Sequence, residues 1–88
     1  MSDYIERIPS YTLTALELYR DERVMPGGFL RCVLRNELRE ALGRADSANR
    51  EHIQEIVWWV YNEMPAVAHG SQAAIDAWVA REDEEDGV

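Results

Sequence analysis

Apolar residues recur at three- and four-residue steps along most of this chain, and this spacing favours helices over strands. The clearest example is the segment 29–42, where leucine, valine and phenylalanine side chains fall on one helical face before Gly43. A glycine directly after such a run is typical of the C′ position that ends a helix. No segment shows a convincing two-residue alternation, so the sequence predicts an all-α protein.

The same spacing predicts three more helices, each with its own start or stop signal. They run from Ser10 to residues 21–23, from a cap at Asp46 or Ser47 to Pro65, and from Gly70-Ser71 into an acidic tail. With short connections between them, we expect a compact bundle of about four short helices in one domain over residues 1–81.

The chain has 88 residues and a single cysteine, Cys32, so no intrachain disulfide can reinforce its core. A domain of this size buries only about two-thirds of the surface of its unfolded chain. Assembly as a homo-oligomer is the remaining common source of stability, and we expect one here. Cys32 has Arg31 beside it but lies among apolar residues, which favours a packed, inert thiol over a reactive one.

The start of the chain, Met1-Ser2-Asp3-Tyr4, lacks the basic and apolar blocks of a signal peptide. No apolar run approaches the roughly 18 residues that span a bilayer, so no membrane partner is expected. With a lone cysteine, the expected location is the reducing cytoplasm of a host cell.

The net charge is −8, which argues against direct DNA binding because non-specific affinity comes mainly from cations that neutralise phosphates. Five of the acids lie in residues 82–86. We interpret residues 82–88 as a disordered acidic tail, with mimicry of a nucleic acid as the alternative.

All nine basic residues are arginines, a bias that a GC-rich genome or a preference for bidentate anion contacts would produce. Arg31, Arg35 and Arg39 are spaced four residues apart on the helix expected over 29–42, and Arg44 follows it. They would form one guanidinium row able to clamp phosphates. Glu37 and Glu40 on the same helix make a solvated, salt-bridged face an equally simple explanation.

The turn before this helix contains Pro26, Gly27 and Gly28, followed by Phe29. Backbone amides at the start of a helix can receive an anion, and glycines let a ligand approach closely. The turn lacks the Gly-Lys-Ser/Thr ending of a P-loop and does not follow a strand. The alternative interpretation is a tight interhelical turn that needs glycine for close packing.

Trp58 and Trp59 are adjacent on the helix that ends at Pro65, where neighbours point about 100° apart. Both cannot face one narrow core, so one of them must look elsewhere. The helix is therefore central in the bundle, part of a subunit interface, or a wall on which a ligand stacks.

No group of residues forms a recognisable catalytic or metal site. His52 and Glu55 have the i, i+3 spacing of a metal pair, but there is no second such pair, which favours a solvent-exposed polar face. His69 has no serine or cysteine nucleophile with a local signature. We therefore expect a protein without catalytic activity, cofactor or metal.

The chain resembles a family of small phage and prophage proteins from about residue 8 to residue 78. The resemblance is carried by Pro26-Gly27-Gly28-Phe29-Leu30, Val33-Leu34-Arg35-Asn36-Glu37-Leu38, Arg44-Ala45-Asp46, Tyr61-Asn62-Glu63-Met64-Pro65 and Gly70-Ser71. The family often has Asn-Asp-Leu in place of Asn36-Glu37-Leu38, and tryptophan in place of His69.

This resemblance implies a non-enzymatic protein that counteracts host antiviral defence. One hypothesis is sequestration of a small anionic nucleotide in an oligomer. Its candidate ligand-binding residues are Gly27, Gly28, Phe29, Arg31, Arg35, Arg39, Arg44, Trp58 and Trp59. The alternatives are an inhibitor that occludes a host defence enzyme or a nucleic-acid-binding channel, or a phage accessory or structural protein.

Overall fold

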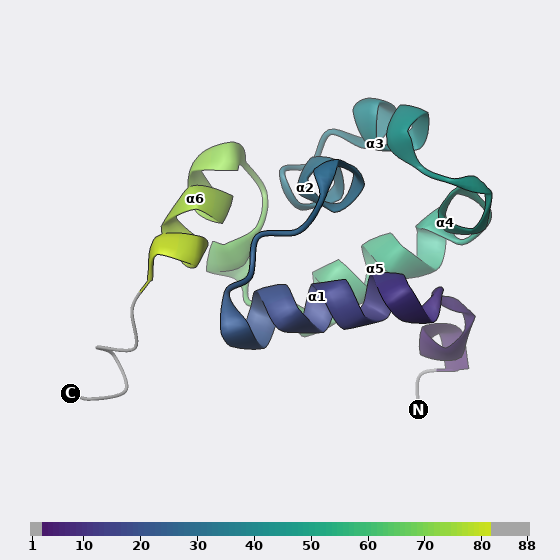
Figure 1. Cartoon of the computed structure of the whole chain (residues 1–88), viewed down its shortest axis with the longest axis horizontal. Helices are drawn as coiled ribbons and strands as arrows, with labels where there is room; N and C mark the ends of the chain where they lie inside the picture. The colour runs from purple at the N-terminus through teal and green to yellow at the C-terminus, as the bar shows by residue number, and fades with distance from the viewer. Residues whose placement is uncertain (1–2, 82–88) are drawn as a thin grey trace.

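The computed structural model describes residues 3–81, and within them the chain is helical and has no strand. Six α-helices and two short 3-10 helices follow one another in this range (Figure 1). They are η1 (Asp3–Arg7), α1 (Ser10–Glu22), α2 (Gly28–Leu34), α3 (Leu38–Arg44), α4 (Ser47–Glu51), α5 (Ile53–Glu63), η2 (Ala66–Ala68) and α6 (Gln72–Ala80). The all-α prediction is confirmed, and the expected number of about four helices is wrong. The tail predicted at 82–88 lies outside the described residues.

The helix expected over 29–42 is divided into α2 and α3 by a turn at Asn36, which has a left-handed backbone with φ of 68°. The amide of Glu37 donates to the carbonyl of Cys32, and the amide of Asn36 donates to that of Val33. This pair of bonds is the Schellman arrangement that ends a helix, and asparagine tolerates the left-handed conformation it needs. Gly43, expected after the end of the helix, lies inside the last turn of α3.

The helix expected from Asp46 or Ser47 to Pro65 is interrupted at His52, which separates α4 from α5. The predicted cap is confirmed, because the Asp46 side chain accepts a hydrogen bond from the Asn49 amide. Asn49 is buried and accepts a hydrogen bond from Thr12 of α1. This contact holds α4 against α1, so that α4 and α5 do not continue as one straight helix.

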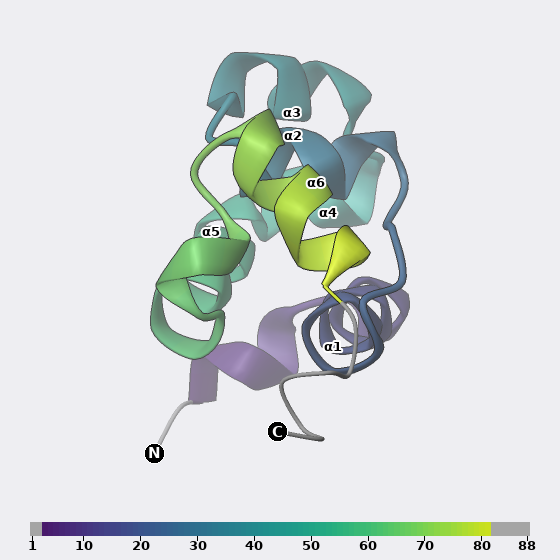
Figure 2. The same ribbon diagram turned by 90° about the vertical axis from the view of Figure 1, so that its left-hand side faces the viewer.

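The first and last helices begin as predicted. The helix α1 runs from Ser10 to Glu22, and Ser71 caps α6 by accepting from the Ala74 amide. Between them, α2 packs on α3 and α6, while α5 packs on η1 and α4. Figure 2 shows α5 on one side of the molecule and α1 on the other, with α2 and α3 above them.

One apolar cluster runs through these helices. Tyr19 of α1 lies at its centre with no exposed surface, and its hydroxyl donates to the Ala68 carbonyl at 2.7 Å. The indole of Trp78 donates to the Tyr19 carbonyl at 2.9 Å. Tyr19 thus joins α1 to η2 and α6 through two buried hydrogen bonds.

Candidate functional site

The predicted glycine turn lines a cleft of about 300 Å³ between α1, the start of α2 and the end of α3, which we call the glycine cleft. It is lined by Tyr11, Thr12, Ala15, Gly27, Gly28, Phe29, Leu30, Arg44, Asp46 and Asn49. Four of the nine candidate residues, Gly27, Gly28, Phe29 and Arg44, therefore meet here. Tyr11 adds an exposed aromatic ring that sequence reasoning missed.

Gly28 lies in the glycine cleft against the side chain of Arg44. A β-carbon at position 28 would approach the Arg44 Nη1 to 3.2 Å, which is tighter than an ordinary van der Waals contact. Gly27 has open space around it. The structure therefore gives Gly28 the packing role expected of a tight turn.

The charged groups of the glycine cleft already have partners. Arg44 forms an ion pair with Glu40, with 3.3 Å between Nη2 and the carboxylate. The Tyr11 hydroxyl donates to Asp46 at 2.7 Å. The Asn49 amide and then the Tyr11 hydroxyl hold the pKa of Asp46 below its usual value, and the same bond raises the pKa of Tyr11. The charged groups of the cleft are thus balanced by their own partners.

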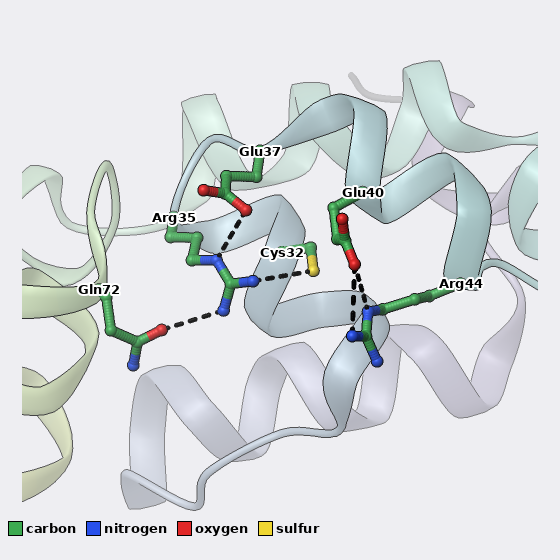
Figure 3. Close-up of polar contacts among 6 residues, drawn as sticks. All are labelled: Cys32, Arg35, Glu37, Glu40, Arg44 and Gln72. Carbon is green, nitrogen blue, oxygen red and sulfur yellow. Dashed lines mark hydrogen bonds and ion pairs between the residues drawn. The ribbon is translucent and has the colours of Figure 1, made fainter.

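The predicted guanidinium row is interrupted, because the turn at Asn36 places Arg31 and Arg35 on one side of the break and Arg39 on α3. Arg31 and Arg39 are exposed. The guanidinium of Arg35 lies 3.2 Å from Glu37, donates to Gln72 at 3.1 Å and contacts the Cys32 sulfur at 3.5 Å (Figure 3). Arg35 therefore links α2 to α6 rather than projecting into a phosphate clamp.

One tryptophan of the pair is buried and the other is exposed, as expected for adjacent residues on a helix. Trp59 is 3% exposed, and the Arg20 guanidinium lies 5.1 Å from its ring centroid. Trp58 is 48% exposed and meets the ring of Tyr4 edge-on at 5.9 Å. Neither tryptophan lines the glycine cleft. Among the described residues, the nine candidates therefore do not form one site.

A second concave region follows α5, where two hollows meet at Val57; we call it the apolar trough. One hollow has a volume of about 360 Å³ and the other about 290 Å³. The larger is lined by Val33, Leu34, Asn36, Val57, Val60, Tyr61, His69 and Gly70, and the smaller by Leu38, Ile53, Gln54, Val57 and Trp58. The trough thus lies between α5, the α2–α3 turn and the loop before α6.

Large apolar side chains remain exposed along this trough. Tyr61 is 77% exposed, and Leu38, Val57 and Trp58 are also classed as exposed. Leu38 and Tyr61 are not among the nine candidate residues chosen from the sequence. The sequence carried a signal for this surface, because the helix that contains Trp58 and Trp59 is apolar around more of its circumference than one buried face needs.

His69 lines the larger hollow together with the polar side chain of Asn36. Burial lowers the pKa of His69, because the protonated imidazole loses solvation there. The neighbouring Gly70 amide donates to the Leu34 carbonyl at 2.6 Å, which fixes the loop against the end of α2. The trough therefore has an apolar floor with a neutral imidazole at its edge.

The structure gives no support to a metal pair at His52 and Glu55. The His52 Nδ1 lies 3.6 Å from Glu55, which also faces Arg7 at 3.9 Å. Within residues 3–81 there is no group of three or more potential metal-ligating side chains. Cys32 is buried, as predicted for a packed thiol.

Comparisons of the chain with protein-family models, with curated proteins and with solved structures found no match. Among the described residues, no helix combines the length and the apolar character needed to cross a bilayer.

Proposed function

We propose that this chain is a non-catalytic binding protein that acts by protein–protein contact, with the apolar trough as its contact surface. The observation that carries the proposal is the exposure of two large aromatic side chains, Trp58 and Tyr61, on one helix beside two hollows. Tryptophan and tyrosine are the residues most enriched where protein interfaces concentrate their binding energy.

The exposed area is large enough to matter energetically. A buried aromatic side chain covers about 150–250 Å², so the exposed fractions of 48% for Trp58 and 77% for Tyr61 leave roughly 190–310 Å² open. At about 25 cal/mol per Å², covering these two rings would contribute roughly 5–8 kcal/mol before the costs of association. The largest apolar patch on a typical monomer covers about 300–600 Å² and is often functional, and these two rings alone approach the lower end of that range.

The phage resemblance supplies the proposed setting. A small phage-type protein without a catalytic group would counteract host defence by covering a working surface of a host protein. An apolar trough with an aromatic wall suits a helix of the target, since amphipathic helices dock into such grooves through side chains at i, i+3, i+4 and i+7.

The proposal is tested in bacteria that carry known antiviral defence systems. The full chain is expressed in a panel of such hosts, and the plating efficiency of a sensitive phage is measured. We expect the natural chain to restore plating against at least one system and Trp58→Glu to lose that effect, because a carboxylate would be buried at the contact.

The matched control is Leu18→Glu, which places the same charge on an exposed apolar site, 42% exposed, on α1. It should keep the effect, and circular dichroism melting should show both variants folded. The proposal is refuted if plating is restored equally by the chain and by Trp58→Glu, or if no system in the panel responds.

A second candidate function is capture of a small anionic nucleotide in the glycine cleft. The observation that favours it is the meeting of Gly27, Gly28 and Arg44 with the rings of Phe29 and Tyr11 in one cleft of about 300 Å³. This volume lies at the lower limit of typical small-molecule sites.

Native mass spectrometry with a panel of cyclic and linear nucleotides tests this second function. We expect a retained nucleotide mass for the natural chain and its loss in Arg44→Ala, since Arg44 is the cation that lines the cleft. Arg39→Ala, which removes an exposed arginine outside the cleft lining, is the control. Absence of any bound nucleotide would refute nucleotide capture and leave the trough unaffected.

A further inference from the structure

Four residues of α5 form a straight strip on its outer surface, which we call the α5 seam: Gln54, Val57, Trp58 and Tyr61. Their spacing is i, i+3, i+4 and i+7, which places them on one side of a helix. All four are exposed, and Figure 2 shows α5 at the outside of the molecule. A strip with this spacing is the surface through which one helix packs against another.

We propose that the α5 seam is the contact between two copies of this chain, with the two α5 helices antiparallel about a twofold axis. This inference rests on the proposed function, because the seam forms the outer wall of the apolar trough. It goes further by naming the occupant, so that a second copy and a target helix would compete for the same surface.

The seam is complementary to itself in this arrangement. In an antiparallel pair centred between positions 57 and 58, each Trp58 faces Val57 of the second copy, so that a large ring meets a small side chain. Each Gln54 faces Tyr61 of the second copy, which brings an amide next to a phenol hydroxyl. A twofold interface requires this reciprocity, in which residue i contacts j and j contacts i.

The charge distribution restricts where a second copy can dock. The chain has a net charge of −8, so two copies repel each other, and this repulsion is smallest where they meet along a surface without charged side chains. Between Gln54 and Tyr61 the one acidic or basic residue is Glu55, whose side chain is 16% exposed and lies near Arg7 and His52. The seam is therefore a neutral strip on an acidic molecule.

The two exposed rings supply about half of the apolar area that a dimer of ordinary size needs. A standard interface buries about 800 Å² per partner, of which about 60% is apolar, or roughly 480 Å². The Trp58 and Tyr61 rings supply roughly 190–310 Å² of this area, as calculated above. Val57 and the adjoining Leu38, both exposed, contribute further apolar surface to the same patch.

The first measurement is sedimentation equilibrium of the full chain over a range of concentrations. We expect a species of twice 10.2 kDa that dissociates on dilution. Trp58→Glu should shift the equilibrium to monomer by at least about 100-fold in Kd, because it places two carboxylates near the twofold axis. Leu18→Glu is the control, and it should dimerise as the natural chain does.

The second measurement is cysteine cross-linking under mild oxidation, which reports the direction of the helices. Positions 54 and 61 lie about 10 Å apart along α5 at 1.5 Å per residue. In the antiparallel pair, Gln54→Cys/Tyr61→Cys should form a covalent dimer, whereas neither single variant should, since its two new cysteines are too far apart. Cys32 is buried and does not interfere.

Each outcome decides a separate point. A natural chain that stays monomeric, or a dimer that persists in Trp58→Glu, overturns the second copy as occupant. Cross-linking of the single variants overturns the antiparallel arrangement. A monomer whose Trp58→Glu variant still loses its effect on phage plating would leave the proposed function standing without the dimer. A Trp58→Glu variant that still dimerises and keeps that effect would remove both proposals.

Discussion

The two buried hydrogen bonds of Tyr19 make it the best residue for a quantitative test. Tyr19→Phe removes the hydroxyl and leaves the Ala68 carbonyl without its partner, while the ring and the Tyr19 carbonyl that receives Trp78 remain. A buried acceptor that loses its partner costs about 1–3 kcal/mol. Against a typical total of about 5–15 kcal/mol for a domain, this loss is easily measured.

The ionisation of Tyr19 adds a pH dependence with a definite sign. Burial, reinforced by the nearby Asp76 carboxylate, raises the pKa of Tyr19 to about 12, from about 10 in the unfolded chain. The folded state therefore holds the proton more tightly, and stability falls as pH rises from 10 toward 12. With one pKa unit equal to about 1.4 kcal/mol, the natural chain should lose about 1.4 kcal/mol through Tyr19 between about pH 9 and about pH 11.

The assay is urea unfolding followed by circular dichroism at several pH values. Near pH 7 we expect the natural chain to exceed Tyr19→Phe by about 1–3 kcal/mol, and by about pH 11 this difference should shrink by about 1.4 kcal/mol. A difference that stays constant across this range would refute the raised pKa of Tyr19 in the folded chain.

Tyr4→Phe is the matched control for the loss of a tyrosine hydroxyl. The Tyr4 hydroxyl is buried and has no hydrogen-bond partner within the described residues. Its removal should leave the free energy of unfolding unchanged or slightly higher, because no bond is lost and a polar group leaves the interior. A loss as large as that of Tyr19→Phe would show that the hydroxyl itself, rather than its bond to Ala68, determines the effect.

Three further changes test other parts of the fold. Thr12→Val should lower the free energy of unfolding by about 1–3 kcal/mol in urea titrations, because the buried Asn49 oxygen loses its donor; an unchanged value would contradict this. Asn36→Val should cost about 1–2 kcal/mol and Asn36→Gly much less, since the left-handed turn disfavours β-branched residues; equal losses in thermal melts would refute the turn. Protonation of His69 favours unfolding, because burial lowers its pKa in the folded chain below the value of about 6.5 in the unfolded chain. His69→Gln should therefore reduce the stability that is lost as pH falls through about 6.5. Identical melts of the natural chain and the variant from pH 7 to pH 5 would refute this prediction.

Local sequence signals predicted most of the helical structure correctly. The start of α1 at Ser10 agrees with the structure. The caps at Asp46 and Ser71 also agree, because a cap depends on side chains within three residues of the helix start. The sequence also required that one tryptophan of the Trp58–Trp59 pair leave the core, since adjacent helical side chains diverge by about 100°.

The helix breaks could not be read from the same signals, because long-range contacts decide them. The carbonyl of Leu34 would accept the amide of Leu38 in a continuous helix, but it receives the Gly70 amide at 2.6 Å instead. The buried bond between Thr12 and Asn49 similarly holds α4 against α1. Each contact joins residues more than thirty positions apart, which a hydrophobic period does not report.

The candidate site was likewise predicted only in part. The choice of nine residues from the sequence rested on one continuous helix over 29–42 and on one row of arginines. The turn at Asn36 separates that row. Gly28 and Arg44 nevertheless meet, because the same turn folds α3 back toward the start of α2. The trough at Tyr61 forms where α5, the α2–α3 turn and the loop before α6 come together, and the sequence alone does not reveal that these three segments are close.

The sequence by itself determined that the chain is helical, where several helices begin, and that one tryptophan of the pair must leave the core, because period, caps and turn residues act over a few positions. The tertiary structure alone decided that Trp58 is the exposed ring, that Arg35 contacts Gln72 of α6, and that the α5 seam faces outward. These properties depend on which surfaces of the helices are covered, and only packing between distant segments determines that.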